Sequence, residues 1–93
     1  MTDDAIRRRV TVHGRVQGVF FRDSLRRRAD SHHVAGWARN RSDGAVEAVF
    51  EGEPEDVERL VDFCRRGPRA AAVERIDVAA ESPDGLTGFR VAF

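Results

Sequence analysis

The sequence lacks several features that would point to particular classes of protein. Its single cysteine, Cys64, can form neither a disulfide within the chain nor a multi-thiolate metal site. No apolar run approaches the roughly 20 residues that a membrane-spanning helix needs. The acidic start, Met-Thr-Asp-Asp, differs from the basic and then apolar start of a secretory signal. We therefore expect a cytoplasmic protein that has no membrane partner.

Lysine is also missing, so all 16 basic residues are arginine, and 16 acidic residues balance them to a net charge of zero. Nucleic acids and anionic membranes attract proteins mainly through an excess of positive charge. A neutral chain predicts no nucleic-acid partner. Among 93 residues, an apolar content of 41% is typical of one small globular domain. We place this domain at residues 9–93, after a tail at 1–8. Arg7, Arg8 and Arg9 are expected to form a solvated face or a mobile tail.

Hydrophobic periodicity predicts strands at 9–13, 37–41, 45–51, 76–80 and 89–93. Two helices separate them. Phe21, Leu25, Ala29 and His32 form one stripe of the first helix. The second helix begins at Pro54 and ends before Gly67-Pro68. This order predicts an α+β fold, the ferredoxin-like βαββαβ two-layer sandwich, with two helices on one face of an antiparallel sheet and a short extra strand at the C-terminus.

Residues Arg15 to Phe20 form a loop between the first strand and the first helix. Gly14 and Gly18 permit backbone angles that let successive N–H groups converge on one point. The start of the helix adds N–H groups without acceptors, and Arg22 can add a bidentate contact. This arrangement suits a bound phosphate. Glycine-containing loops between a strand and a helix are common, so the glycines alone are a weak signal.

Asn40 lies near the end of the expected strand at 37–41, and in isolation it is more typical of a residue that caps a hairpin. Its sequence context is more specific. Two segments resemble the two signatures of the acylphosphatases. The first runs from Val12 to Arg22 and reads Val-His-Gly-Arg-Val-Gln-Gly-Val-Phe-Phe-Arg. The second is defined by the spacing of Gly36-Trp37, Asn40, Gly44 and Gly52. The resemblance covers nearly the whole chain.

This resemblance implies the ferredoxin-like fold and an enzyme that hydrolyses the carboxyl–phosphate bond of small acyl phosphates to carboxylate and inorganic phosphate. It implies that Arg22 binds the phosphoryl group and that Asn40 orients the attacking water. The phosphate-binding loop would consist of Arg15, Val16, Gln17, Gly18, Val19 and Phe20. Neither a metal nor a cofactor is expected, and the protein is expected to be a monomer.

The chemistry of acyl phosphates agrees with the scarcity of other catalytic motifs. A carboxylate leaving group has a conjugate acid with a pKa of about 4–5, so it departs without a general acid. Phosphoryl transfer then needs mainly positioning and charge stabilisation. Two alternatives remain. One is a module with the same fold that binds RNA or a small anionic metabolite, and the other is a degenerate domain of this family that serves as a carbamoyl-phosphate-handling or regulatory unit. The chain departs from the family at His32 and His33, where an apolar residue and a glycine are usual, and His33 is expected to take the left-handed helix cap at some cost.

Overall fold

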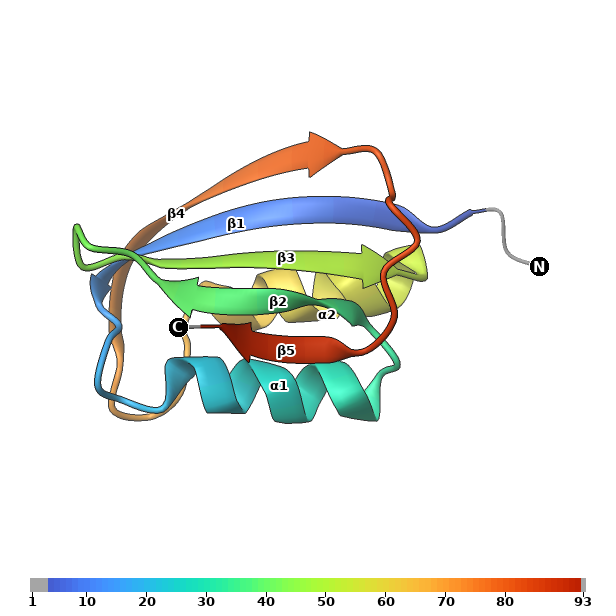
Figure 1. The fold of residues 1–93 in the computed structure, drawn as a ribbon. Helices are drawn as coiled ribbons and strands as arrows, with labels where there is room; N and C mark the ends of the chain where they lie inside the picture. Colours follow the sequence, from blue (N-terminus) through green and yellow to red (C-terminus); the bar gives the residue numbers. More distant parts are fainter. Residues whose placement is uncertain (1–3, 93) are drawn as a thin grey trace.

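A computed structural model describes residues 4–92 as two helices and five strands (Figure 1). The strands and helices follow one another in the predicted order, with a short fifth strand at the end. The elements are β1 (Ile6–Arg15), α1 (Phe21–Ser31), β2 (Ala35–Asn40), β3 (Val46–Gly52), α2 (Pro54–Cys64), β4 (Ala72–Glu81) and β5 (Phe89–Ala92).

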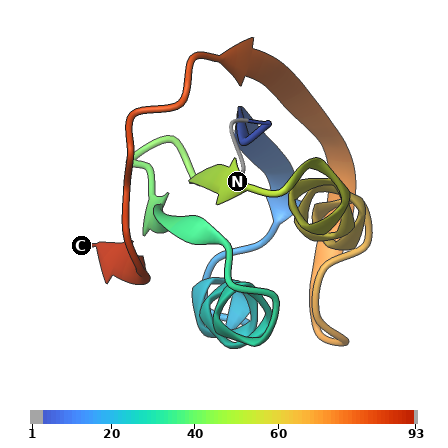
Figure 2. The ribbon, with the colours of Figure 1, turned by 90° about the vertical axis from the view of Figure 1, so that its right-hand side faces the viewer.

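The strands form one sheet in the order β4-β1-β3-β2-β5, and both helices cover the same face of it (Figure 2). Neighbouring strands are antiparallel, except that β5 runs parallel to β2. The predicted ferredoxin-like α+β sandwich is confirmed. Its topology brings the loop after β1, the C-terminal end of β2 and strand β5 to one region of the molecule (Figure 1).

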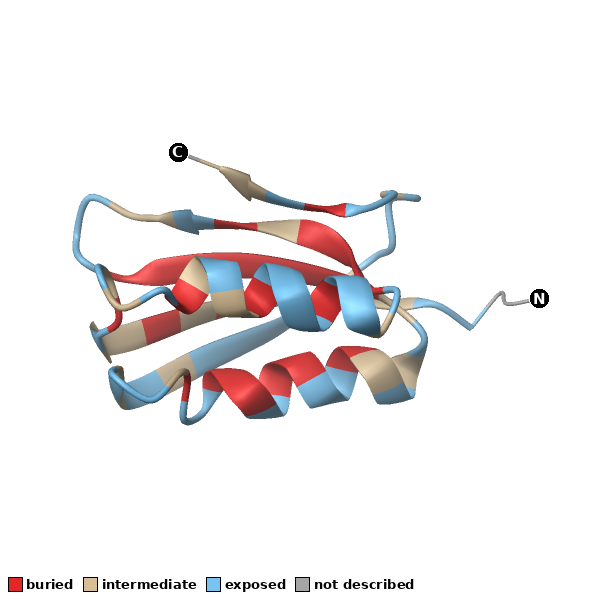
Figure 3. Cartoon of the chain, turned by 90° about the horizontal axis from the view of Figure 1, so that it is seen from below, coloured by how far each residue is buried: buried red, intermediate tan, exposed pale blue. Residues whose placement is uncertain are grey.

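The core lies between the sheet and the two helices, whose buried residues form stripes that face the strands (Figure 3). Phe21, Leu25 and Ala29 of the predicted α1 stripe are buried, whereas His32 is only half-buried and follows the helix. The buried residues of α2 include Phe63 beside Cys64. Neither helix in residues 4–92 has the length and apolar character that crossing a membrane requires.

The end of α1 has the expected left-handed cap at a non-glycine residue. His33 has φ 57°, and the N–H of Val34 donates to the carbonyl of Ala29 at 2.8 Å. This bond reaches back over the helix end, as in a Schellman motif. A side chain at φ 57° costs backbone energy that glycine would avoid.

The first strand begins at Ile6, three residues before the predicted start. The prediction of a solvated tail is therefore wrong for residues 6–8, and residues 1–3 lie outside the described part of the chain. Arg7 lies on the outer face of the sheet, where its Nε donates to Glu81 Oε1 at 2.8 Å and its Nη1 to Glu51 Oε1 at 3.3 Å. Ion pairs with Glu51 on β3 and Glu81 on β4 thus hold the side chain of Arg7 against the sheet.

Arg9 continues the same row of ion pairs. Its Nη1 donates to Glu47 Oε2 at 2.6 Å and its Nε to Glu81 Oε2 at 2.6 Å. Burial alone would raise the pKa of Glu47, but the hydrogen bonds from Arg39 and Arg9 outweigh it and hold that pKa below its usual value. The outer face of the sheet is therefore held together by paired charges, and the inner face by apolar packing.

Candidate active site

The loop between β1 and α1 turns through two left-handed residues. Gly18 has φ 76°, and Phe20, the residue before the helix, has φ 64° and ψ 27°. A Cβ on Gly18 would meet nothing within 4 Å, so glycine is favoured there by backbone angle alone. Gly14 differs, because a Cβ at that position would overlap the backbone of Ala72 on β4. Its glycine permits the close approach of β1 and β4 just before the loop.

Backbone N–H groups gather where the loop enters the helix. The first hydrogen bond of α1 runs from the N–H of Ser24 to the carbonyl of Phe20 at 3.0 Å, so the N–H groups at 21–23 have no acceptor within the helix. Within residues 4–92, the N–H groups at 17–20 also donate to no other residue. Donors at a helix N-terminus, together with the positive end of the helix dipole, form a site suited to an anion.

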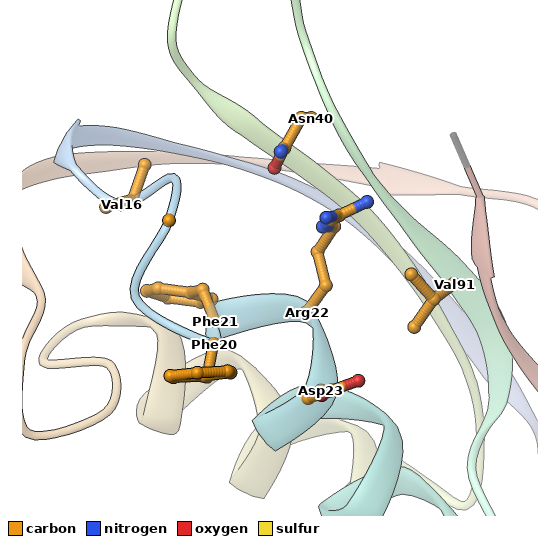
Figure 4. A pocket seen from close by; sticks show the side chains of 8 residues that line it. Val16, Phe20, Phe21, Arg22, Asp23, Asn40 and Val91 are labelled. Atoms are coloured by element: carbon orange, nitrogen blue, oxygen red, sulfur yellow. The ribbon is translucent and has the colours of Figure 1, made fainter.

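A cavity of about 300 Å³ lies beside these donors (Figure 4). Arg22 reaches it from the first turn of α1, and Asn40 reaches it from the last residue of β2. In Figure 4 the ends of these two side chains point toward the same space. The structure therefore brings together two residues that are 18 positions apart in the sequence. The cavity is lined by Val16, Gly18, Phe20, Phe21, Arg22, Asp23, Asn40 and Val91.

The guanidinium of Arg22 is held from the C-terminal strand. Its Nη1 donates to the carbonyl of Ala92 at 3.1 Å. An arginine in the first turn of a helix faces the positive end of the helix dipole, which disfavours it. Two positive features are thus directed at one cavity, which makes the cavity attractive to an anion.

Asn40 carries an unusual polar atom. Its Oδ1 is buried, and no residue among 4–92 donates a hydrogen bond to it. An acceptor in this state costs free energy unless a donor reaches it. Asn40 pairs with Val46 across the β2–β3 hairpin, so the sheet fixes its backbone. The turn that follows is stabilised by Asp43, whose Oδ1 accepts from the N–H of Ala45 at 3.1 Å, a bond that lowers the pKa of this carboxyl.

Three residues of the predicted loop do not line the cavity. Arg15 is exposed at the end of β1, and Val19 packs partly against the core. The side-chain amide of Gln17 turns to the β2–β3 hairpin, where Nε2 donates to the carbonyls of Arg41 at 2.8 Å and Ala45 at 3.0 Å. Gln17 therefore connects the loop to the hairpin that carries Asn40.

Sequence reasoning missed three residues that border the cavity. Phe21 was assigned only to the core, and it is 2% exposed there. Val91 was assigned only to a strand, and the alternation of β5 gives no sign that this strand lies beside α1. Asp23 follows Arg22 directly, but an acidic residue in the first turn of a helix is common enough to carry no signal.

No three His, Cys, Asp or Glu side chains in residues 4–92 lie close enough together to hold a metal ion. The sole cysteine, Cys64, is buried in the core, away from the cavity, and burial raises the pKa of its thiol. The absence of a metal from the reaction stays a prediction.

Comparison with known proteins gives a consistent result. A family model described as acylphosphatase matches residues 8–91. An acylphosphatase from Gloeobacter violaceus is 58% identical over 87 residues, which cover 94% of each chain. The crystal structure of an acylphosphatase from Bacillus subtilis superposes with a TM-score of 0.90 at 35% identity and covers 95% of this chain and 99% of that one. For an acylphosphatase structure from Coxiella burnetii, the TM-score is 0.92 at 37% identity, with coverage of 99% and 100%.

Proposed function

This chain belongs to the acylphosphatase family and is an enzyme that hydrolyses acyl phosphates; from that premise we propose how its residues divide the reaction. The backbone N–H groups of residues 15–20 and the guanidinium of Arg22 bind the phosphoryl group, and Asn40 orients the water that attacks phosphorus. The observation that supports this division is the shared cavity, which Arg22 and Asn40 border from different elements beside the N–H groups of the loop.

Arg22 supplies charge at a fixed position. Its hydrogen bond to the carbonyl of Ala92 restrains the long side chain, so less rotamer freedom remains to be lost when a phosphoryl group binds. A guanidinium presents a planar fork of N–H donors that matches two phosphate oxygens. Together with the loop N–H groups, it stabilises the negative charge on the phosphoryl oxygens in the transition state.

Asn40 supplies orientation. A water that donates one of its O–H groups to the buried Oδ1 keeps its lone pairs free, and one of them can attack phosphorus. The bond from phosphorus to the carboxylate oxygen breaks as the bond to water forms, and the carboxylate leaves with the electron pair. A phosphate oxygen of the substrate takes the proton of the water. The products are a carboxylate and inorganic phosphate.

This division of roles needs neither a metal, nor a cofactor, nor a general acid, because the departing carboxylate is already a weak base. We propose that small acyl phosphates are the only ligands of the site, that nucleic acid is not a partner, and that the protein acts as a cytoplasmic monomer. The net charge of zero supports the exclusion of nucleic acid.

Hydrolysis of benzoyl phosphate, followed by ultraviolet absorbance with EDTA present, tests this function. We expect turnover that resists EDTA and that falls by about 10²-fold or more in Asn40→Ala, while an exposed control variant, Ser82→Ala, keeps the wild-type rate. Folded protein without turnover at several pH values and salt concentrations would contradict the proposal. Titration with phosphate and with RNA would then decide whether the loop only binds an anion.

A further inference from the structure

Phe20 is the most exposed large apolar residue of the described chain. Its side chain is 75% exposed, whereas the adjacent Phe21 is 2% exposed in the core. Burial of an aromatic ring is a large favourable contribution to folding. Because Phe20 is largely exposed, its ring makes only a small part of this contribution to the stability of the fold.

The backbone of Phe20 is also unfavourable for this residue type. Its φ of 64° and ψ of 27° lie in the left-handed region, where glycine and asparagine are preferred. It occupies the N-cap of α1 but makes no side-chain capping bond, and small polar residues are preferred there. Glycine or asparagine would thus satisfy the fold better at this position, and strain of this kind is typical of functional sites.

The position of Phe20 relative to the reacting groups suggests what the ring contacts. Phe20 and Asn40 both border the cavity, and in Figure 4 Asn40 lies above Arg22 whereas Phe20 lies below it. Attacking and leaving oxygens are roughly in line at phosphorus. If the water lies at Asn40 and the phosphoryl group lies between, the acyl group points to the side of Phe20.

We propose that the ring of Phe20 binds the acyl portion of the substrate and selects acyl phosphates whose acyl group is apolar or aromatic. This inference rests on the roles proposed above for the loop, Arg22 and Asn40. Val91 adds an apolar side chain to the cavity.

The test compares kcat/KM for benzoyl phosphate and for acetyl phosphate in the wild type, in Phe20→Ala and in Phe20→Leu. Contact between two aromatic rings predicts that the benzoyl-to-acetyl ratio falls about three- to tenfold in Phe20→Ala. Phe20→Leu should give an intermediate ratio. Val78→Ala removes an exposed apolar side chain from β4, far from the cavity, and should leave the ratio as in the wild type.

Two further measurements separate contact from structure. Phe20→Asn relieves the backbone strain and removes the ring, so it should lower the ratio as much as Phe20→Ala does. The inhibition constant of inorganic phosphate reports the integrity of the loop and should stay within about twofold of the wild type in all three Phe20 variants, because phosphate lacks an acyl group. An unchanged benzoyl-to-acetyl ratio in Phe20→Ala and Phe20→Asn would overturn the proposal. A wild-type protein that hydrolyses neither benzoyl phosphate nor acetyl phosphate would instead contradict the proposed function.

Discussion

Gln17 offers a direct test of how the phosphate loop is positioned. Its Nε2 donates to the carbonyls of Arg41 and Ala45 at 2.8 and 3.0 Å. Arg41 follows Asn40, so these two bonds join the loop to the strand end that carries the proposed water-orienting residue. Gln17→Met keeps most of the side-chain volume and removes both bonds, and Gln17→Glu keeps the shape but replaces the donor by a carboxylate.

The expected magnitude follows from the number of bonds. Each hydrogen bond contributes about 0.5–1.5 kcal/mol net, so Gln17→Met should lower the free energy of unfolding by about 1–3 kcal/mol. For a domain of this size, each kcal/mol lowers the Tm by about 4–8 °C. Gln17→Glu should cost more, since its carboxylate faces two carbonyl oxygens and places a negative charge beside a phosphate site.

Thermal unfolding measured by circular dichroism gives the stability, and competitive inhibition by inorganic phosphate gives the state of the loop. We expect a lower Tm and weaker phosphate inhibition in Gln17→Met, and a larger effect on both in Gln17→Glu. The reasoning is refuted if Gln17→Glu retains the Tm and the phosphate inhibition constant of the wild type, because the two bonds would then position nothing.

Three further predictions concern stability and reactivity. Glu51 is 5% exposed, and burial would raise its pKa, but the N–H groups of residues 84–86 and Arg7 outweigh burial and lower it. A lowered folded-state pKa stabilises the fold at pH values above the unfolded pKa of about 4.3, and this contribution disappears as pH falls through the folded pKa. Urea unfolding should therefore show that Glu51→Gln has a free energy of unfolding about 1–3 kcal/mol below that of the wild type at pH 7. The difference between the two proteins should narrow below pH 4. Gly36 has φ 143°, and in Gly36→Ala the new Cβ would overlap the carbonyl of Val49, so calorimetry should show that the free energy of unfolding falls by about 3 kcal/mol or more. The decrease should be much smaller in Gly44→Ala, because nothing lies within 4 Å of a Cβ at that position. Because Cys64 is buried and its pKa is raised, a chromogenic disulfide reagent should label it only as fast as the protein unfolds, and rapid labelling of the native protein would contradict this.

Local patterns predicted most of the fold. The apolar stripe of α1 and that of α2 have helical spacing, and Pro54 and Gly67 mark where the second helix begins and ends, so each helix could be placed from its own residues. The alternation of Val10 and Val12 likewise placed the first strand, and both are buried. Periodicity sufficed for these elements because each presents one apolar face to one core.

Pairing between distant residues could not be predicted in this way. Arg7 was assigned to a tail, yet its partners Glu51 and Glu81 lie 44 and 74 residues away in the sequence. Only the register of β1 with β3 and β4 brings these charges together. The same limit applies to Gln17, whose carbonyl partners lie across the β2–β3 hairpin.

The candidate site was predicted in its main members but not in its surroundings. Arg22 and Asn40 were identified from the family signatures, and the structure places both at one cavity. Val91 and the carbonyl of Ala92 came to the site only through the parallel pairing of β5 with β2. The four residues of β5 contain no sequence pattern that indicates which strand β5 pairs with.

The central claim is the division of labour between Arg22 and Asn40, and one paired measurement tests it: kcat and the inhibition constant of inorganic phosphate in Arg22→Ala and Asn40→Ala. We predict that Arg22→Ala loses phosphate inhibition together with nearly all activity. In Asn40→Ala, kcat should fall by about 10²-fold or more, while phosphate inhibits almost as in the wild type. An equal loss of phosphate inhibition in both folded variants would contradict the account, because Asn40 would then bind the phosphoryl group instead of orienting water.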